Sequence, residues 1–241
     1  MRGLSRIGKS AAIALILLGF WQHARSAEAS DGAPLLTVPT EPSSPAETLQ
    51  EISRNGLPCP IPDSPLIAQA IALYEGPFWE DGGECETVCT GLLVTNTSDT
   101  MIEYAKITLA QNGQTLSFEI TYFPPGSDLL VLEKDQTPFS EAPVERLCCP
   151  RLSYFEGSLR SPQVYVSPYG ACSMVATNLT DRPLETVNIF YKHYFTEENL
   201  YIGGITYQAI LNCLQPGESR STTAYHFLSD QGKILLYSAI E

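Results

Sequence analysis

The sequence predicts an all-β protein with two tandem antiparallel β-sandwich domains, which follow a signal peptide and a disordered linker. Three observations support this. Past residue 66, short segments rich in β-branched and aromatic residues are separated by turn residues at regular spacing. One sequence pattern occurs twice, and no long amphipathic helical pattern lies between the strands.

The start of the chain has the layout of an export signal. Arg2, Arg6 and Lys9 give a basic beginning. Residues 11–21 then form an uncharged apolar run, followed by small polar residues. This run is about half of the ~20 residues that a membrane-spanning helix needs, which favours a cleaved signal peptide over residues 1–27. An uncleaved anchor or an amphipathic helix is the alternative. We therefore expect a secreted or extracytoplasmic cell-surface protein.

The rest of the chain is strongly acidic. The full sequence has a net charge of −13, with 14 basic and 27 acidic residues, and four of the basic residues but none of the acidic ones lie in the predicted signal. Such a surface repels phosphate backbones and anionic lipid head groups. We therefore expect no nucleic-acid partner, and no integral membrane association after signal cleavage.

Residues 28–65 are dominated by Pro, Ser, Thr and Glu. They carry too little apolar surface to offset the entropy that ordering would cost. We expect a disordered linker here, extended where prolines cluster after residue 57.

An internal repeat divides the remaining chain into domains at 66–150 and 151–241. Placing Asn96 on Asn178 aligns identical residues without a gap: Thr95 with Thr177, Asp99 with Asp181, Glu103 with Glu185 and Ile107 with Ile189. Further on, the second copy has nine extra residues before its Pro-Gly turn. Two copies of one unit indicate tandem domains rather than a solenoid.

Each copy has the alternation of a half-buried strand. Apolar residues alternate with polar ones in the first copy at Leu116, Phe118, Ile120 and Tyr122. The corresponding residues of the second copy are Tyr207, Ala209, Leu211 and Cys213. Turn signals such as Asn112-Gly113, Gly82-Gly83 and Gly203-Gly204 separate the segments, which indicates antiparallel sandwiches.

Several motifs of these segments resemble FxLYD-type and related Ig-like bacterial surface modules. They are V-x-N-x-[ST], I-x-x-A-x-I and a strand that closes on a hydrophobic residue and Pro-Gly, within residues 85–130 and 168–220. The F-x-L-Y-D lead-in is absent, and Phe78-Trp79-Glu80-Asp81 stands in its place. The resemblance implies tandem Ig-like domains. It does not indicate any particular activity, because one fold serves many functions.

An exported chain favours disulfides among its seven cysteines, which leaves one thiol over. Cys172 and Cys213 share the inward positions of their segments. If the two strands are antiparallel neighbours, these residues meet inside the second domain, where a bridge would contribute about 3 to 4 kcal/mol. Two buried thiols without a bond are the alternative.

Four other cysteines lie nearer the predicted domain junction. Cys85 and Cys89 take outward positions, and Cys148 and Cys149 lie between the repeats. We expect bridges from the first pair to the second. Zinc is the weaker alternative, because the C-x-x-C spacing of structural zinc sites is missing, and we expect no bound metal.

The sequence carries no recognisable catalytic motif. His193 and His226, the histidines of the mature chain, lie outside nucleophile and metalloprotease motifs. Carboxylate pairs such as Glu197 with Glu198 occur in glycosidases, but they are ordinary in a chain with 27 acidic residues. We name no catalytic residue and expect no cofactor.

Two segments, Asn96-Thr97-Ser98 and Asn178-Leu179-Thr180, match the N-glycosylation sequon. Both occupy the same position of the repeat. A turn in which Asn tolerates unusual dihedrals and bonds its own backbone explains this coincidence better.

The nine-residue expansion of the second copy is the most binding-like feature. A longer hairpin there would present tyrosine faces to a sugar or a partner protein. The candidate ligand-binding residues are Lys192, His193, Tyr194, Tyr201 and Tyr207. Alternatively, these side chains fill the core of a small sandwich.

These patterns favour an exported, non-catalytic protein with a binding, adhesion or assembly role at a cell surface, with a protein or glycan partner. The competing class is a secreted or surface enzyme that acts on glycans or the cell wall through acidic residues that no motif singles out. An enzyme requires a cleft with convergent titratable groups, whereas a binding protein can use a flat surface.

Overall fold

The computed structural model describes residues 56–83, 85–196, 198–227 and 231–241, which form an all-β protein. This confirms the predicted all-β class. The predicted signal peptide and residues 28–55 of the predicted linker lie outside the described residues. The described residues include no helical segment with the length and hydropathy of a membrane span.

The strands divide between the two halves of the chain. In the first half they are β1 (Cys59–Pro60), β2 (Leu66–Pro77), β3 (Glu86–Asn96), β4 (Ile102–Gln111), β5 (Gln114–Phe123), β6 (Asp128–Leu132) and β7 (Val144–Tyr154). A short 3-10 helix, η2 (Trp79–Asp81), follows β2. In the second half they are β8 (Val164–Pro168), β9 (Ser173–Asn178), β10 (Leu184–Phe195), β11 (Leu200–Leu214), β12 (Ser219–Thr223) and β13 (Gly232–Ile240).

The two halves share one strand order. In the first half β2-β3-β6 lie together and β5-β4-β7 form a second sheet, and in the second half β8-β9-β12 and β11-β10-β13 take the same places. Leu92 of β3 and Phe118 of β5 are buried in one core, and Met174 of β9 and Ile189 of β10 in another. Each half therefore consists of two sheets packed face to face around its own core.

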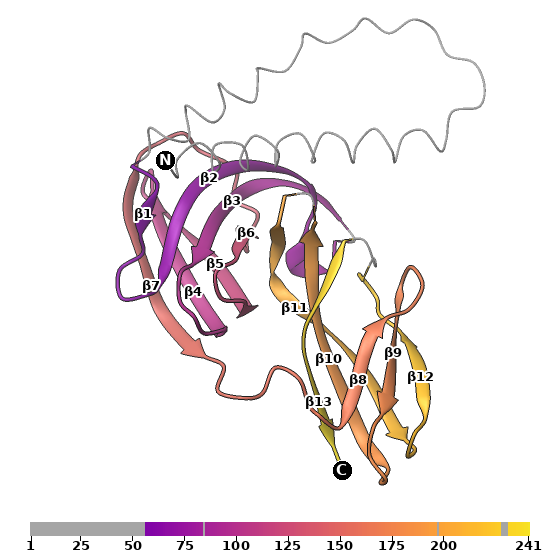
Figure 1. Cartoon of the computed structure of the whole chain (residues 1–241). Coiled ribbons are helices and arrows are strands. Elements are labelled where there is room, and N and C mark those ends of the chain that lie inside the picture. The colour runs from indigo at the N-terminus through magenta and orange to yellow at the C-terminus, as the bar shows by residue number, and fades with distance from the viewer. Residues whose placement is uncertain (1–55, 84, 197, 228–230) are drawn as a thin grey trace, which may run out of the picture.

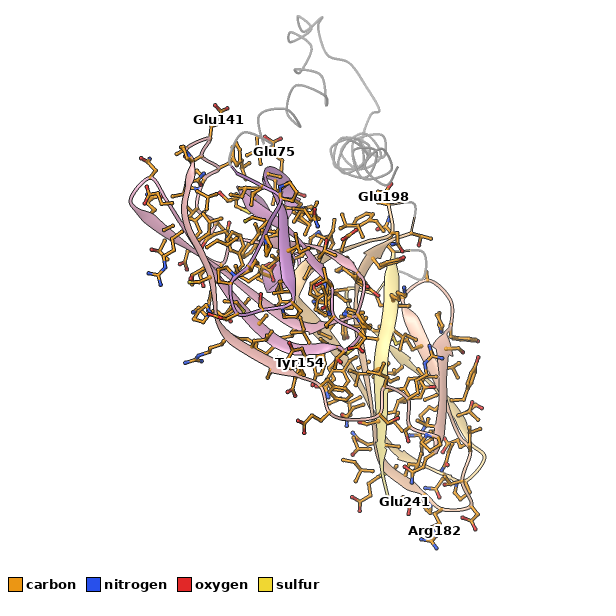
Figure 2. The ribbon with its side chains drawn as sticks, turned by 60° about the vertical axis from the view of Figure 1, so that its left-hand side comes forward. Glu75, Glu141, Tyr154, Arg182, Glu198 and Glu241 are labelled. Atoms are coloured by element: carbon orange, nitrogen blue, oxygen red, sulfur yellow. The ribbon has the colours of Figure 1, made fainter. Side chains whose placement is uncertain are left out.

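One sheet continues from the first sandwich into the second. Residues 128–130 of β6 pair in parallel with residues 200–202 of β11. The result is a seven-stranded sheet with the order β1-β2-β3-β6-β11-β10-β13 (Figure 1). Figure 2 shows the elongated shape that follows, with Glu141 near one end and Arg182 and Glu241 at the other. A backbone ladder thus joins the two sandwiches.

A buried asparagine ends β3 in the first sandwich and β9 in the second. The side-chain nitrogen of Asn96 donates to three backbone carbonyls within 3.2 Å, and that of Asn178 to two within 3.0 Å. Their side-chain oxygens accept the backbone N–H of Ser98 and Thr180 at 3.1 and 2.8 Å. The predicted self-bonded turn is confirmed, although neither Asn has a positive φ. Both side chains are buried and their nitrogens are fully used, so neither sequon presents a free acceptor.

Replacing Asn96 by alanine is expected to lower the free energy of unfolding by about 2–3 kcal/mol, because buried carbonyls lose their donor. Urea unfolding followed by circular dichroism would measure this. Asn188→Ala is the matched control, since Asn188 is half-buried and its side chain accepts from the exposed Gln208. Equal decreases in the free energy of unfolding of the two variants would show that the Asn96 hydrogen bonds stabilise the fold no more than a surface hydrogen bond does.

The sandwiches extend beyond the boundaries that the sequence predicts. Leu57 and Ile61, which the prediction places in the disordered linker, are 6% and 1% exposed in the first core. Their apolar side chains pack into that core, so residues 57–61 belong to the first sandwich. The predicted boundary between residues 150 and 151 falls inside β7, which pairs with β4 as far as Tyr154.

Candidate functional site

The five residues predicted to bind a ligand, Lys192, His193, Tyr194, Tyr201 and Tyr207, do not form an exposed surface. Lys192, His193 and Tyr201 are 0%, 3% and 2% exposed, and the other two are half-buried. The nine extra residues lengthen β10 and β11, and the pairing of β11 with β6 brings their side chains to the junction of the sandwiches. The predicted ligand surface is therefore wrong.

At this junction β11 bulges around a buried lysine. Tyr191 pairs with Tyr207 but His193 pairs with Ile202, so residues 203–206 of β11 bulge out opposite Lys192 alone. The Nζ of Lys192 donates to the carbonyls of the bulge: Gly203 at 3.1 Å, Gly204 at 2.6 Å and Ile205 at 2.6 Å. Three ammonium N–H donors thus meet three carbonyl acceptors.

A carboxylate from the first sandwich holds the other side of the bulge. Glu80 of η2 accepts the backbone N–H of Gly204 at 2.7 Å and of Ile205 at 3.1 Å, and also that of Leu132 on β6 at 2.9 Å. Burial raises the pKa of Glu80, and these N–H groups oppose that shift. Burial lowers the pKa of Lys192 to about 7, and the Glu80 carboxylate opposes it. Glu80 from the first sandwich and Lys192 from the second therefore both bond the backbone of the same bulge.

Aromatic side chains close the junction around this pair. The rings of Trp79 and His193 lie 3.9 Å apart between centroids, and Tyr207 donates its hydroxyl to the Trp79 carbonyl at 3.0 Å. The Nε2 of His193 is buried and has no hydrogen-bond partner. Burial, helped by nearby His226, lowers the pKa of His193 to about 4. The imidazole is therefore neutral over the ordinary pH range.

His193 is expected to make the folded protein sensitive to acid. The unfolded chain takes up this proton near pH 6.5, but the folded protein takes it up only near pH 4. The stabilisation is thus complete above pH 6.5 and is lost as the pH falls through 4. Its size is about 3 kcal/mol. Urea unfolding between pH 4 and 7 should show a shallower pH dependence for His193→Phe than for the wild type.

The control for this measurement is His226→Gln, which removes an exposed histidine. It should retain most of the pH dependence. Parallel pH profiles for the wild type and His193→Phe would contradict the assignment to His193.

The predicted bridge between Cys172 and Cys213 is wrong. Both residues are exposed, and β9 pairs with β8 and β12 rather than with β11. Asn178, at the far end of β9 from Cys172, reaches the carbonyl of Leu214, beside Cys213. The length of β9, about 20 Å, therefore separates the two cysteines, and a disulfide needs Cα atoms within about 7 Å.

The predicted bridges from Cys85 or Cys89 to Cys148 or Cys149 do not form either. Cys89 packs on the outer face of β3, and burial raises its pKa to about 11. Cys148 and Cys149 lie on β7, in the opposite sheet of the sandwich. All seven cysteines fall among the described residues, and all are free thiols.

Among the described residues, the carboxylates and histidines that could act in catalysis or metal binding do not come together in a site. Glu197 lies outside the described residues, Glu198 is 9% exposed and His226 is exposed. The described residues contain no group of three or more His, Cys, Asp or Glu side chains that could hold a metal. An open pocket of about 330 Å³ lies between residues 155–162 and β13, and no Asp, Glu, His, Lys or Arg lines it.

An uncharged surface covers the outer face of the β8-β9-β12 sheet. We call it the hydroxyl face and define it as Tyr165, Ser167, Tyr169, Ser173, Val175, Thr177, Ser219, Ser221 and Thr223. The residues that alternate with them, such as Val166, Met174 and Ala176, are buried in the second core. Figure 1 shows this sheet on the side of the second sandwich that is turned away from the first.

The strand register arranges the hydroxyl face in rows. One row is Tyr165, Thr177 and Ser219, and the next is Ser167, Val175 and Ser221. The hydroxyls of Thr177 and Ser219 lie 2.8 Å apart. The first row therefore crosses all three strands with hydroxyl groups, and the second has Val175 between two serines.

The equivalent face of the first sandwich has a different character. Tyr74, Leu93 and Leu132 are buried there, in a cluster that includes residues of β11. The outer face of the β5-β4-β7 sheet carries charges, such as the pair Lys106 and Glu119 at 3.7 Å. The outer face of the β11-β10-β13 sheet around Asn188 and Ile210 is also uncharged, but it carries amide and aliphatic side chains. The hydroxyl face differs from all three in its exposed tyrosines among serines and threonines.

Comparisons with protein family models, with curated proteins and with solved structures find no match to this chain. Two features of the chain itself therefore remain as the basis for its function. They are the buried junction and the exposed hydroxyl face.

Proposed function

We propose that this chain is an exported, non-catalytic binding protein built from two Ig-like modules. It acts at a cell surface and contacts its partner through the hydroxyl face. One observation carries the proposal: the hydroxyl face exposes Tyr165 and Tyr169 among serines and threonines without any charged residue.

Export is supported by the first residues of the sequence. A basic start, an uncharged run over residues 11–21 and small polar residues after it follow the order of a cleaved signal. The Ig-like assignment is supported by the two sandwiches, which repeat one strand order.

The composition of the hydroxyl face supports binding. Solvent-facing sheets ordinarily carry Lys, Arg, Glu and Asp, which keep a surface soluble. Here Tyr165 and Tyr169 are 56% and 61% exposed among Ser and Thr. Exposed tyrosine is enriched where proteins bind, because its ring adds apolar area and its hydroxyl a polar group.

The junction between the sandwiches supports a role in which the hydroxyl face is held rigidly toward its partner. Glu80 and Lys192 fasten η2, β6 and β11 together. A shared sheet and a buried charge pair limit rotation of one sandwich against the other. The hydroxyl face is thus held at a fixed orientation, which lowers the entropy that binding would cost.

The half-buried Glu80 and the buried Glu133 do not favour the competing enzyme class. The oxygens of Glu80 accept backbone N–H groups at the junction. Glu133 accepts those of Ser117, Asp135 and Thr137 at 3.1, 2.9 and 2.8 Å. Both carboxylates therefore accept hydrogen bonds from backbone N–H groups, and neither faces an open site where a substrate could bind.

A cell-binding assay tests the proposal. Fluorescently labelled mature protein would be incubated with cells of the species that produces it, and Val175→Lys would be compared with Ile210→Lys. Val175 lies in the middle of the hydroxyl face, whereas Ile210 is 49% exposed on the outer face of β11. We expect at least a tenfold loss of cell binding for Val175→Lys and wild-type binding for Ile210→Lys.

Circular dichroism would verify that both variants fold. Wild-type binding by a folded Val175→Lys would overturn the assignment of the face. Failure of the wild-type protein to bind cells would overturn the surface role itself.

A further inference from the structure

We infer that the hydroxyl face binds an uncharged polysaccharide chain. This rests on the proposed function, because it names the partner of the same face. The first argument is electrostatic. A chain with a net charge of −13 repels polyanions at long range, and the face offers no cation to hold one.

The second argument is the spacing of hydrogen-bonding groups. Adjacent strands lie about 4.8 Å apart across the sheet, and alternate residues of one strand lie about 6.8 Å apart along it, so the hydroxyl-bearing side chains start from a regular grid. Ser219, Ser221 and Thr223 follow one strand in this way, and Thr177 and Ser173 continue the pattern on the next. A polymer with repeated hydroxyls can form one modest hydrogen bond at each contact. The binding free energies of these bonds add up along the length of the polymer.

The third argument concerns the tyrosines. Tyr165, Tyr169 and Tyr225 are 56%, 61% and 75% exposed. Tyr169 donates its backbone N–H to Ser173 at 2.8 Å, and Ser173 pairs with Thr223, two residues before Tyr225. Tyr169 and Tyr225 therefore lie beside the same end of the face. Their rings offer flat apolar surfaces for the C–H groups of a sugar ring, and their hydroxyls remain free for hydrogen bonds.

A protein partner fits the face less well. Protein interfaces are centred on buried apolar and aromatic anchors. Tyr165 and Tyr169 follow β8, the edge strand of this sheet, rather than its centre. At the centre lies Val175, the one aliphatic member of the hydroxyl face, which is half-buried between its neighbours. The apolar area at the centre is too small to anchor a protein, whereas the hydroxyl rows suit a hydrated polymer.

Affinity electrophoresis of the mature protein tests the inference. Native gels would contain hydroxyethyl cellulose, dextran or galactomannan as uncharged polymers, and alginate as a polyanion. We expect retardation by at least one uncharged polymer and none by alginate. The triple variant Tyr165→Ala, Tyr169→Ala and Tyr225→Ala should lose at least tenfold in affinity. Tyr154→Ala, at a 42% exposed tyrosine of the first sandwich, is the matched control and should bind as the wild type does.

The outcomes separate this inference from the proposed function. If Val175→Lys loses cell binding but no uncharged polymer retards the protein, the inference is wrong and the surface role stands. Retardation by alginate, or wild-type retardation of a folded triple variant, also overturns it. Loss of cell binding after protease treatment of the cells would identify a protein partner and overturn it as well. Failure of cell binding in every variant would remove the proposed function itself.

Discussion

A Lys192→Met variant is expected to lose about 3–5 kcal/mol of unfolding free energy. Methionine keeps an unbranched side chain as long as the four-carbon stem of lysine and removes the ammonium. The carbonyls of Gly203, Gly204 and Ile205 then lose their donor in a site from which water is excluded, and the Glu80 carboxylate loses the cation that offsets its burial. Urea unfolding would measure the loss.

The fluorescence of Trp79 would locate the damage. Trp79 is the one tryptophan beyond the predicted signal, because the other is Trp21. It packs on His193 beside the bulge, so its emission should shift to longer wavelength when the junction loosens. Lys106→Met is the matched control, since Lys106 forms a partly exposed ion pair on the sheet surface that is worth less than about 1 kcal/mol. Similar losses in the two variants would mean that the buried ammonium is not what holds the junction.

A double variant, Glu80→Gln with Lys192→Met, refines this expectation. Removing one member of a buried pair leaves an uncompensated charge, whereas removing both leaves none. The double variant should therefore be less destabilised than the sum of the single variants. A strictly additive loss would indicate that the two groups act on the backbone independently of each other.

The repeated strand pattern made much of each sandwich predictable. Leu116, Phe118 and Ile120 are buried as their alternation predicts. Asn112-Gly113 forms the predicted turn between β4 and β5, with φ of 53° and 70°. These features depend on near neighbours in the chain, and local periodicity carries that information.

The alternation fails at one position of each copy for a local reason. Tyr122 and Cys213, which the repeat aligns, both have positive φ, 43° and 55°. This turn of the backbone sends the next residue inward, and Phe123 and Leu214 are fully buried. Cys213 is exposed as a result, which removes the premise of its predicted bridge. Neither Tyr nor Cys signals such a conformation in a sequence.

The junction was unpredictable because its partners are distant in the chain. Glu80 bonds Gly204, 124 residues away, and β6 pairs in parallel with a strand of the other sandwich. No local pattern distinguishes Glu80 from the other acidic residues. The hydroxyl face did carry a signal: S-x-V-x-T at residues 173–177 and S-x-S-x-T at 219–223 contain no charge at alternate positions. Its significance depends on knowing that these positions face outward together.

Gly203-Gly204, which the sequence predicts to be a turn, instead lies within β11, and Gly204→Ala is expected to force the sandwiches apart. A Cβ at Gly204 would lie 1.8 Å from the carbonyl oxygen of Glu119 on β5. That oxygen belongs to the backbone, so a whole strand must move. The movement would also break the bond from Thr206 Oγ1 to the Thr121 carbonyl, at 2.9 Å. We expect a loss of about 3 kcal/mol, with Trp79 emission shifted toward that of exposed tryptophan.

Gly91→Ala separates this effect from the general cost of replacing glycine in a strand. Gly91 lies on β3 without a positive φ, and its Cβ would meet Leu130 Cδ1 at 3.0 Å. That methyl group can rotate away, so the loss should stay below about 1 kcal/mol. If Gly204→Ala lowered the free energy of unfolding no more than Gly91→Ala, β5 and β11 could move apart without destabilising the protein. The orientation of the hydroxyl face would then not be fixed by the junction, and its presentation would have to depend on the β6–β11 ladder alone.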